Sequence, residues 1–183
     1  MEAGPLRYLI LKPMKKFGFI ILLPFLYGHC SYGQTPANGN DVKTKEAIIS
    51  ALYEVISGAA DGKRDWERFR NLFLPESRLV PTGKNGQGGF TIRSISPEGY
   101  IQMFTDNVKK GFYEKELHHE AEEYGTISHI FSTYETRESI GGPVSNRGIN
   151  SIQLYNDGNR YYIVNILWCA ESMGFPLPSK YLH

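Results

Sequence analysis

The sequence His118-His119-Glu120 is a cluster of neighbouring titratable side chains with the residue types of a catalytic or metal site. It falls in a segment, Glu114 to Tyr124, with the pattern of a long strand, in which consecutive residues point to opposite faces. His118 and His119 are therefore not expected to bind one metal ion together, and we predict no metal site. With a tight turn at Gly125-Thr126, His119 lies on the apolar face. There its ring could act as a general base near neutral pH, or simply be hydrogen-bonded in the core.

The closing segment of the chain, Arg147 to Glu171, has the pattern of a β-hairpin around Asp157-Gly158, a residue pair that favours two-residue turns. Such a turn places Asn156 opposite Asn159 and fixes which side chains share a face. One face would carry Arg147, Ile149, Ser151, Gln153 and Tyr155 opposite Trp168, Ile166, Val164, Tyr162 and Arg160, and the other Asn150, Ile152 and Leu154 opposite Asn165, Ile163 and Tyr161. Both faces mix apolar and polar groups, so we expect one to be covered by the chain and the other to make a further contact.

Three helices are predicted before and between the strands. Apolar residues at three- and four-residue spacing after Thr44 indicate the first helix, and Asp65 stands where the N-cap of a second would be, over Trp66 to Phe73. Ser96-Pro97-Glu98 begins a third, with cap, N1 proline and first-turn acid in order. The remaining strands are expected at residues 77–81, 90–93, 114–124 and 126–138. Helices segregated from an antiparallel sheet define an α+β layer fold.

This order of elements resembles the nuclear transport factor 2-like superfamily, whose members include ketosteroid isomerases, scytalone dehydratase and polyketide cyclases. The resemblance covers about residues 43–171, and the tail from Phe175 to Leu182 is similar to that of exported bacterial members of unknown role. It implies a curved antiparallel sheet wrapped by three N-terminal helices into a cone with a ligand pocket. The residues that carry it are Ala51-Leu52-Tyr53-Glu54, Gly58-Ala59-Ala60-Asp61, Asp65-Trp66, Leu72-Phe73 and a last strand ending Ile166-Leu167-Trp168-Cys169-Ala170-Glu171.

The isomerase branch of the superfamily allows a residue-by-residue comparison. Tyr53 matches the position of the oxyanion-hole tyrosine, and Ser151 falls where those enzymes have a protonated aspartic acid. Their general-base aspartate is expected just after Val80, where this sequence has Pro81 and Thr82. The resemblance therefore implies the fold without the inherited proton transfer.

The same resemblance implies which side chains of the closing hairpin would line the pocket. Aromatic walls with a few polar groups are typical of small-molecule sites. Ordinary core packing explains the aromatic residues equally well, so both interpretations stay open. The implied ligand-binding residues are Arg147, Ser151, Gln153, Tyr162 and Trp168, and His119 is expected to reach the same cavity as Trp168.

The N-terminal segment has the composition of a secretory signal peptide. Met14-Lys15-Lys16 is a basic start, residues 17–26 are mainly apolar, and Ser31-Tyr32-Gly33 places small residues at the cleavage positions. The apolar stretch is about half of the roughly 20 residues that a membrane span needs, so no stable span is expected after cleavage. We therefore divide the chain into a leader and signal peptide over 1–33, a linker over 34–43 and one domain over 44–183, exported to the periplasm or secreted.

The composition of the exported part excludes some partners. Loss of residues 1–33 removes four of the 20 basic and one of the 19 acidic residues, which leaves 16 and 18 and a formal net charge of −2. Without a basic patch, nucleic acid is not an expected partner. Cys169 is then the only cysteine, so the fold must hold without an internal disulfide.

A homodimer is expected from the face of the closing hairpin that is predicted to point outward. That face carries several apolar side chains, which is too many for a surface in contact with solvent. The side chains in question are Ile152, Leu154, Tyr161 and Ile163.

The sequence favours an exported protein that binds a small, partly apolar molecule without a cofactor. One alternative is a cofactor-independent dehydratase, isomerase or cyclase in which His119 moves a proton and Tyr53 or Tyr134 polarises an oxygen. The other is a protein-interaction module whose cone is filled by its own side chains. A free pocket distinguishes the first two from the third, and a histidine inside it favours the enzyme.

We predict that the exported protein begins at Gln34, because a basic start, an apolar stretch and small residues occur in that order before it. Mass spectrometry of the protein recovered from the periplasm or the medium should give the mass of residues 34–183. Recovery of a peptide that contains residues 17–26, or of lipid on Cys30, contradicts this prediction.

Overall fold

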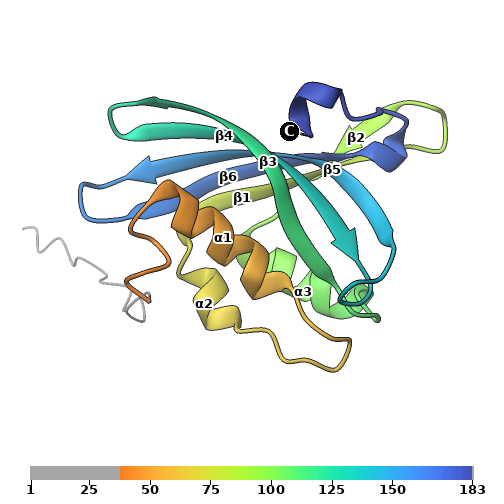
Figure 1. Cartoon of the computed structure of the whole chain (residues 1–183), viewed down its shortest axis with the longest axis horizontal. Helices are drawn as coiled ribbons and strands as arrows, with labels where there is room; N and C mark the ends of the chain where they lie inside the picture. The colour runs from red at the N-terminus through yellow and green to blue at the C-terminus, as the bar shows by residue number, and fades with distance from the viewer. Residues whose placement is uncertain (1–37, 183) are drawn as a thin grey trace, which may run out of the picture. The chain divides into compact units, whose positions relative to one another are not determined.

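The computed structural model describes residues 38–182, so the predicted signal peptide, its cleavage site and the first part of the linker lie outside the described residues. Within that range the chain forms an α+β domain, as predicted, with helices on one face of a six-stranded sheet (Figure 1). No helix within it is long and apolar enough to cross a membrane. The elements are α1 (Lys45–Ile56), α2 (Trp66–Arg70), β1 (Phe73–Lys84), β2 (Phe90–Ile92), α3 (Pro97–Asn107), β3 (Tyr113–Tyr124), β4 (Ile127–Arg137), β5 (Val144–Asn156), β6 (Tyr161–Ala170) and the 3₁₀ turns η1 (Glu171–Met173) and η2 (Ser179–Tyr181).

Side-chain caps start all three helices. The Thr44 hydroxyl accepts a hydrogen bond from the Ala47 amide, and Asp65 and Ser96, which the sequence marks as caps, accept in the same way at 2.9 and 3.1 Å. Each cap satisfies an amide that has no partner inside its helix. Helix α2 is shorter than predicted, because Phe73 leaves it to pair with Ile163 of β6.

The sheet has the strand order β2-β1-β6-β5-β4-β3. All neighbours are antiparallel except β1 and β6, which run parallel, so the sheet is mixed rather than antiparallel throughout. The predicted turn at Gly125 is confirmed, since Tyr124 pairs with Ile127 and Gly125 has a φ of 59°. This places His119 opposite Ser132.

The closing hairpin has a different register from the one predicted. Asn156 pairs with Tyr161, because the Asp157 carboxylate accepts the amides of Asn159 and Arg160 and so stabilises a four-residue loop. Further along, the pairing slips by one residue at Val164, which is a β-bulge. A bulge reverses the alternation of side chains beyond it.

The bulge moves Ile166 and Trp168 onto the same face as Ile152, and this face is the one that the helices cover. Ile152 and Ile163 are completely buried, and Leu154 is 2% exposed. The prediction that these residues form an outward apolar surface is therefore wrong, because they are the core of their own chain. The homodimer stays a prediction without them.

Candidate functional site

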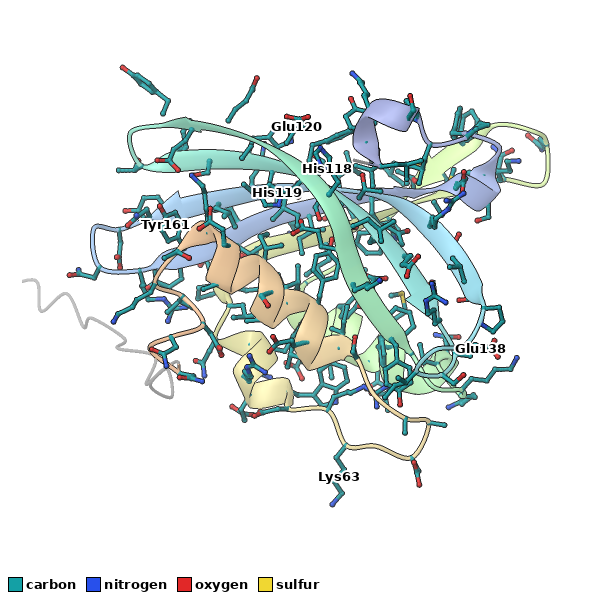
Figure 2. All side chains as sticks on the ribbon, in the orientation of Figure 1. Lys63, His118, His119, Glu120, Glu138 and Tyr161 are labelled. Atoms are coloured by element: carbon teal, nitrogen blue, oxygen red, sulfur yellow. The ribbon has the colours of Figure 1, made fainter. Side chains whose placement is uncertain are left out.

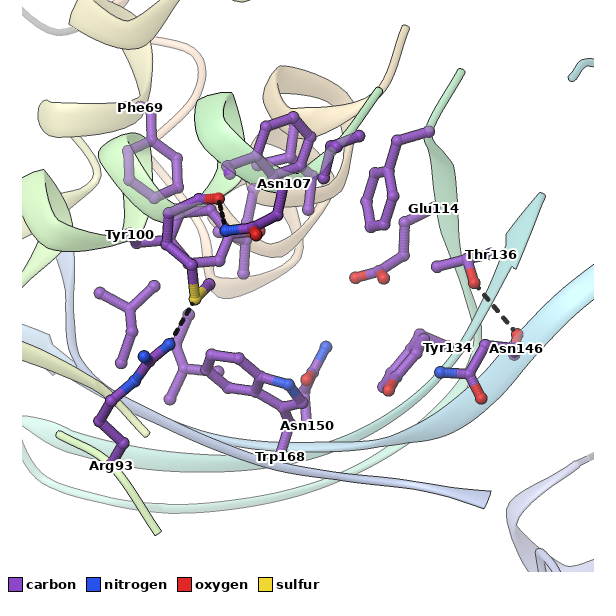
Figure 3. A pocket seen from close by; sticks show the side chains of 18 residues that line it. Phe69, Arg93, Tyr100, Asn107, Glu114, Tyr134, Thr136, Asn146, Asn150 and Trp168 are labelled. Carbon is purple, nitrogen blue, oxygen red and sulfur yellow. Dashed lines mark hydrogen bonds between the residues drawn. The ribbon is translucent and has the colours of Figure 1, made fainter. Parts of the chain in front are cut away.

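A cavity of about 530 Å³ lies between the three helices and the covered face of the sheet (Figure 3). Its walls are mainly apolar and aromatic, with a smaller number of polar side chains among them, which is the usual composition of a small-molecule site. The apolar lining consists of Leu52, Ile56, Phe69, Leu79, Tyr100, Met103, Phe104, Val108, Phe112, Ile166 and Trp168, and the polar lining of Arg93, Asn107, Glu114, Tyr134, Thr136, Asn146 and Asn150.

Aromatic rings from the helices and the sheet form a continuous wall. Tyr100 of α3 stacks on Phe69 of α2 at 5.4 Å between ring centroids and meets Trp168 edge-on at 6.3 Å. Phe104, one turn further along α3, packs edge-on against Phe112 at 5.2 Å. Such pairs add stability beyond the apolar area that they bury, so they stabilise this wall.

Glu114, at the start of β3, is an acid in the cavity wall. The Ser57 hydroxyl after α1 holds its backbone, because it accepts from the Glu114 amide at 2.9 Å and donates to the Glu114 carbonyl at 3.1 Å. The residue is half-buried, and part of its surface borders the cavity. This burial raises the pKa of Glu114 to about 8, although a hydrogen bond with Asn150 offsets part of the rise. At pH 7 the carboxyl group is therefore mostly protonated.

Two tyrosine hydroxyls are influenced by Glu114: that of Tyr134 at the polar end of the cavity and that of Tyr100 in its aromatic wall. Burial, followed by the nearby Glu114 carboxyl, raises the pKa of Tyr100 and of Tyr134, so both phenols keep their protons. Tyr134 has room because its partner on β5 is Gly148, where any side chain would collide with the Tyr134 hydroxyl at 2.5 Å. A neutral acid beside two phenols can donate hydrogen bonds to a ligand oxygen, and the ionised acid can accept a proton.

A chain of buried hydrogen bonds runs behind this polar end. The Asn150 amide donates to the Tyr53 hydroxyl at 3.0 Å, and Tyr53 lies 2.7 Å from the Ser132 hydroxyl. Ser132 donates to Glu116 at 2.5 Å, and Glu116 binds the Nδ1 atom of His119 at 3.0 Å. This chain joins α1 to three strands and fixes the Asn150 side chain at the cavity.

The structure places the predicted catalytic residues in three different environments. Tyr134 lines the cavity. Tyr53 is buried behind it, where burial raises its pKa, and it is not among the lining residues. His119, on β3 (Figure 2), faces the helix side of the sheet as expected but lies outside the cavity and is paired with Glu116. The expectation that His119 and Trp168 share a cavity is wrong.

Of the five residues predicted to bind a ligand, the structure places Trp168 in the cavity and four on the opposite face of the sheet. Arg147 pairs with Glu171 at 2.9 Å, and the Ser151 hydroxyl lies 2.9 Å from His129. Gln153 is exposed, and Tyr162 stacks on Tyr155. The bulge at Val164 separates Trp168 from the other four, because it brings Trp168 to the covered face, whereas Tyr162 and the odd-numbered residues of β5 lie on the other face.

Sequence reasoning missed Glu114, Arg93 and Asn150 as lining residues. Glu114 begins a strand that is rich in charged residues, and this pattern is typical of a solvated edge strand. Asn150 was expected on the outward face, because the predicted register put Trp168 on the same face as Ser151, whereas in the structure Trp168 pairs with Asn150. Tyr100 gave a usable signal, because it lies on the apolar face of the third predicted helix.

The charged groups of the described residues do not gather into a metal site. Nowhere in residues 38–182 do three or more His, Cys, Asp or Glu side chains lie close enough to hold a metal ion. A second hollow, of about 760 Å³, lies between α1 and the start of β3, but it is lined largely by charged and polar groups, among them Glu46, Glu54, Glu116 and Glu135. The cavity with aromatic walls is therefore the better candidate for a site.

Comparison with known proteins identifies the fold. No protein-family model and no curated protein matches this chain. A protein of unknown function with a cystatin-like fold from Nostoc punctiforme PCC 73102 is 13% identical, with a TM-score of 0.51 over 69% of this chain and 92% of that chain. An NTF-2 like protein of unknown function from Silicibacter pomeroyi DSS-3 is 12% identical, with a TM-score of 0.47 over 68% of this chain and 91% of that chain. The likeness to the Nostoc protein confirms the α+β cystatin-like fold, and at this identity it carries no function.

We predict that Glu114→Gln increases the free energy of unfolding at pH 7. In the unfolded chain Glu114 ionises near its ordinary pKa of about 4.3, whereas in the folded protein it keeps its proton up to about pH 8. Between these values the folded state binds more protons than the unfolded state, so stability falls as the pH rises. Between pH 5 and 8 the free energy of unfolding of the parent protein should fall by on the order of 2 to 4 kcal/mol. The variant should not show this fall when both are measured by urea unfolding.

The control for this experiment is Glu122→Gln, which changes an exposed carboxylate on the same strand. It should leave the pH dependence of the parent protein unchanged. If Glu114→Gln and Glu122→Gln follow the same curve as the parent protein, Glu114 is not the buried acid that the geometry indicates.

Proposed function

We propose that this chain is an exported member of the nuclear transport factor 2-like superfamily and that its cavity binds a small, partly apolar molecule with a hydroxyl or carbonyl oxygen. The observation that carries the proposal is the placement of three hydrogen-bonding groups, Glu114, Tyr134 and Asn150, at one end of a cavity whose other walls are mainly apolar. The apolar walls favour burial of a hydrocarbon body, and the polar groups fix its orientation.

The free volume supports binding over the interaction module with a filled cone. A cone filled by its own side chains would have closed the space of about 530 Å³ between the helices and the sheet. Export is supported by the order of basic, apolar and small residues before Gln34.

The test is a thermal-shift screen of residues 34–183 against a library of neutral and acidic metabolites. A ligand at 100 times its dissociation constant adds roughly 2.7 kcal/mol to stability, which is readily detected. Met103→Trp should abolish the shift, because Met103 lines the cavity and the larger side chain occupies it. The matched control, Gln102→Trp, places the same side chain on the exposed face of α3 and should keep the shift. Equal shifts in the two variants would place the ligand elsewhere.

A second candidate function is proton transfer on the bound molecule. The enzyme alternative relied on His119, which lies outside the cavity. Glu114 takes that role in the proposal, because a carboxyl group with a pKa of about 8 can both give and take a proton near neutral pH. Tyr134 would polarise the ligand oxygen beside it.

This candidate predicts exchange of a ligand hydrogen with solvent. A carbonyl compound found by the screen, incubated with the protein in D₂O, should gain deuterium next to its carbonyl group, as measured by NMR. Glu114→Gln should slow the exchange by at least about 100-fold while the compound still binds. Exchange at an unchanged rate in Glu114→Gln removes Glu114 as the base, and binding without exchange in the parent protein leaves the binding function alone.

A further inference from the structure

Arg93 follows β2 and stands at the mouth of the cavity. Arg93 is exposed, as is Asn107 of α3, whereas Glu114 is half-buried and Tyr134 is buried. In Figure 3 the Arg93 guanidinium and the Glu114 carboxyl are at opposite ends of the cavity, with Trp168 and Tyr100 between them. The cavity therefore has a cationic mouth, an aromatic middle and a hydrogen-bonding end.

Arg93 differs from the other arginines of the described residues in its partner. Each of the others donates to at least one oxygen: Arg68, Arg70, Arg137 and Arg147 to carboxylates, and Arg64, Arg78 and Arg160 to backbone carbonyls. The Arg93 side chain donates to the Met103 sulfur at 2.8 Å and to no oxygen of residues 38–182. A thioether is a weak acceptor, so four of the five guanidinium donors remain available at the mouth.

We propose that the molecule bound in this cavity is an amphipathic carboxylate whose anionic head is held by Arg93 and whose apolar body lies between the aromatic walls. The inference rests on the proposed function and names its ligand class. A planar guanidinium binds a carboxylate through two parallel hydrogen bonds, and this fits a head group that stops at the mouth. Because the Glu114 carboxyl at the far end is mostly protonated at pH 7, it does not repel an anion.

Charge elsewhere at the mouth does not favour a cation instead. The cavity lining contains one carboxyl group, Glu114, and it lies at the end opposite Arg93 (Figure 3). The other polar groups near the mouth are neutral, and Asn107 donates to the Met103 carbonyl at 2.7 Å. A ligand with an ammonium head would therefore face Arg93 without a compensating carboxylate.

The experiment compares decanoate, decanol and decylammonium at pH 7 by isothermal titration calorimetry. These probes share one apolar tail and differ in the head group. The protein should bind decanoate at least tenfold more tightly than decanol, and decylammonium the least. In Arg93→Gln the affinity for decanoate should fall to that for decanol, while the affinity for decanol stays within twofold of its value in the parent protein. The charge-matched control Lys63→Gln, at an exposed lysine away from the cavity (Figure 2), should keep the preference.

Each outcome decides the inference. Equal affinities for decanoate and decanol in the parent protein, or a preference for decanoate that survives in Arg93→Gln, overturn it. If decanol or a neutral compound from the library binds without any gain from a carboxylate, the inference falls and the proposed function stands. If neither the alkyl probes nor the library compounds bind, both are overturned.

Discussion

The arrangement of the cavity depends on the hydroxyl group of Tyr53, which joins Asn150 to Ser132 in a chain of buried hydrogen bonds. Glu116 accepts but cannot donate as a carboxylate, so Ser132 must donate to it and Tyr53 must donate to Ser132. The Tyr53 oxygen is then left to accept the Asn150 amide. The hydrogen bonds of this network therefore run in one direction. Every group in it has a partner only when α1, β3, β4 and β5 are all in place. A buried network of this kind is stabilising when complete and costly when one member is missing.

The cavity itself is a departure from the most stable packing. A carboxyl group enclosed beside tyrosines and phenylalanines loses its hydration, and the empty volume forgoes contacts that a filled core would make. An acid with a strongly shifted pKa in a concave site is a candidate functional residue. The aromatic pairs around Tyr100 and the hydrogen-bond network around Tyr53 stabilise the domain and so offset both unfavourable contributions.

Local chemistry made much of this fold predictable, whereas the lining of the cavity depended on one irregularity. Asp65 and Ser96 start helices because their side chains accept hydrogen bonds from nearby backbone amides. Gly125 forms a turn because glycine adopts the positive φ of that turn without strain. The bulge at Val164 has no such marker, since a β-branched residue in an apolar run is typical of any buried strand. Once the bulge is missed, Trp168 is placed on the same face as Ser151 instead of the face of Asn150. Glu114 was missed because the charged residues after it indicate an exposed strand, although its own position, at the end next to α1, is enclosed.

The position of β6 in the sheet constrains how the domain can assemble. The last strand of the sequence lies between β1 and β5, and its parallel pairing with β1 spans more than 80 residues of chain, as in the Leu79 to Ile166 pair. Without residues 161–170, β1 and β2 have no hydrogen-bonded neighbour among the strands β3 to β5, and the covered face of the sheet is interrupted. Long-range pairing of this kind raises contact order and slows folding. Ile166 and Trp168 of this strand line the cavity, so the residues nearest the end of the sheet-forming sequence join its two halves and complete the wall of the site.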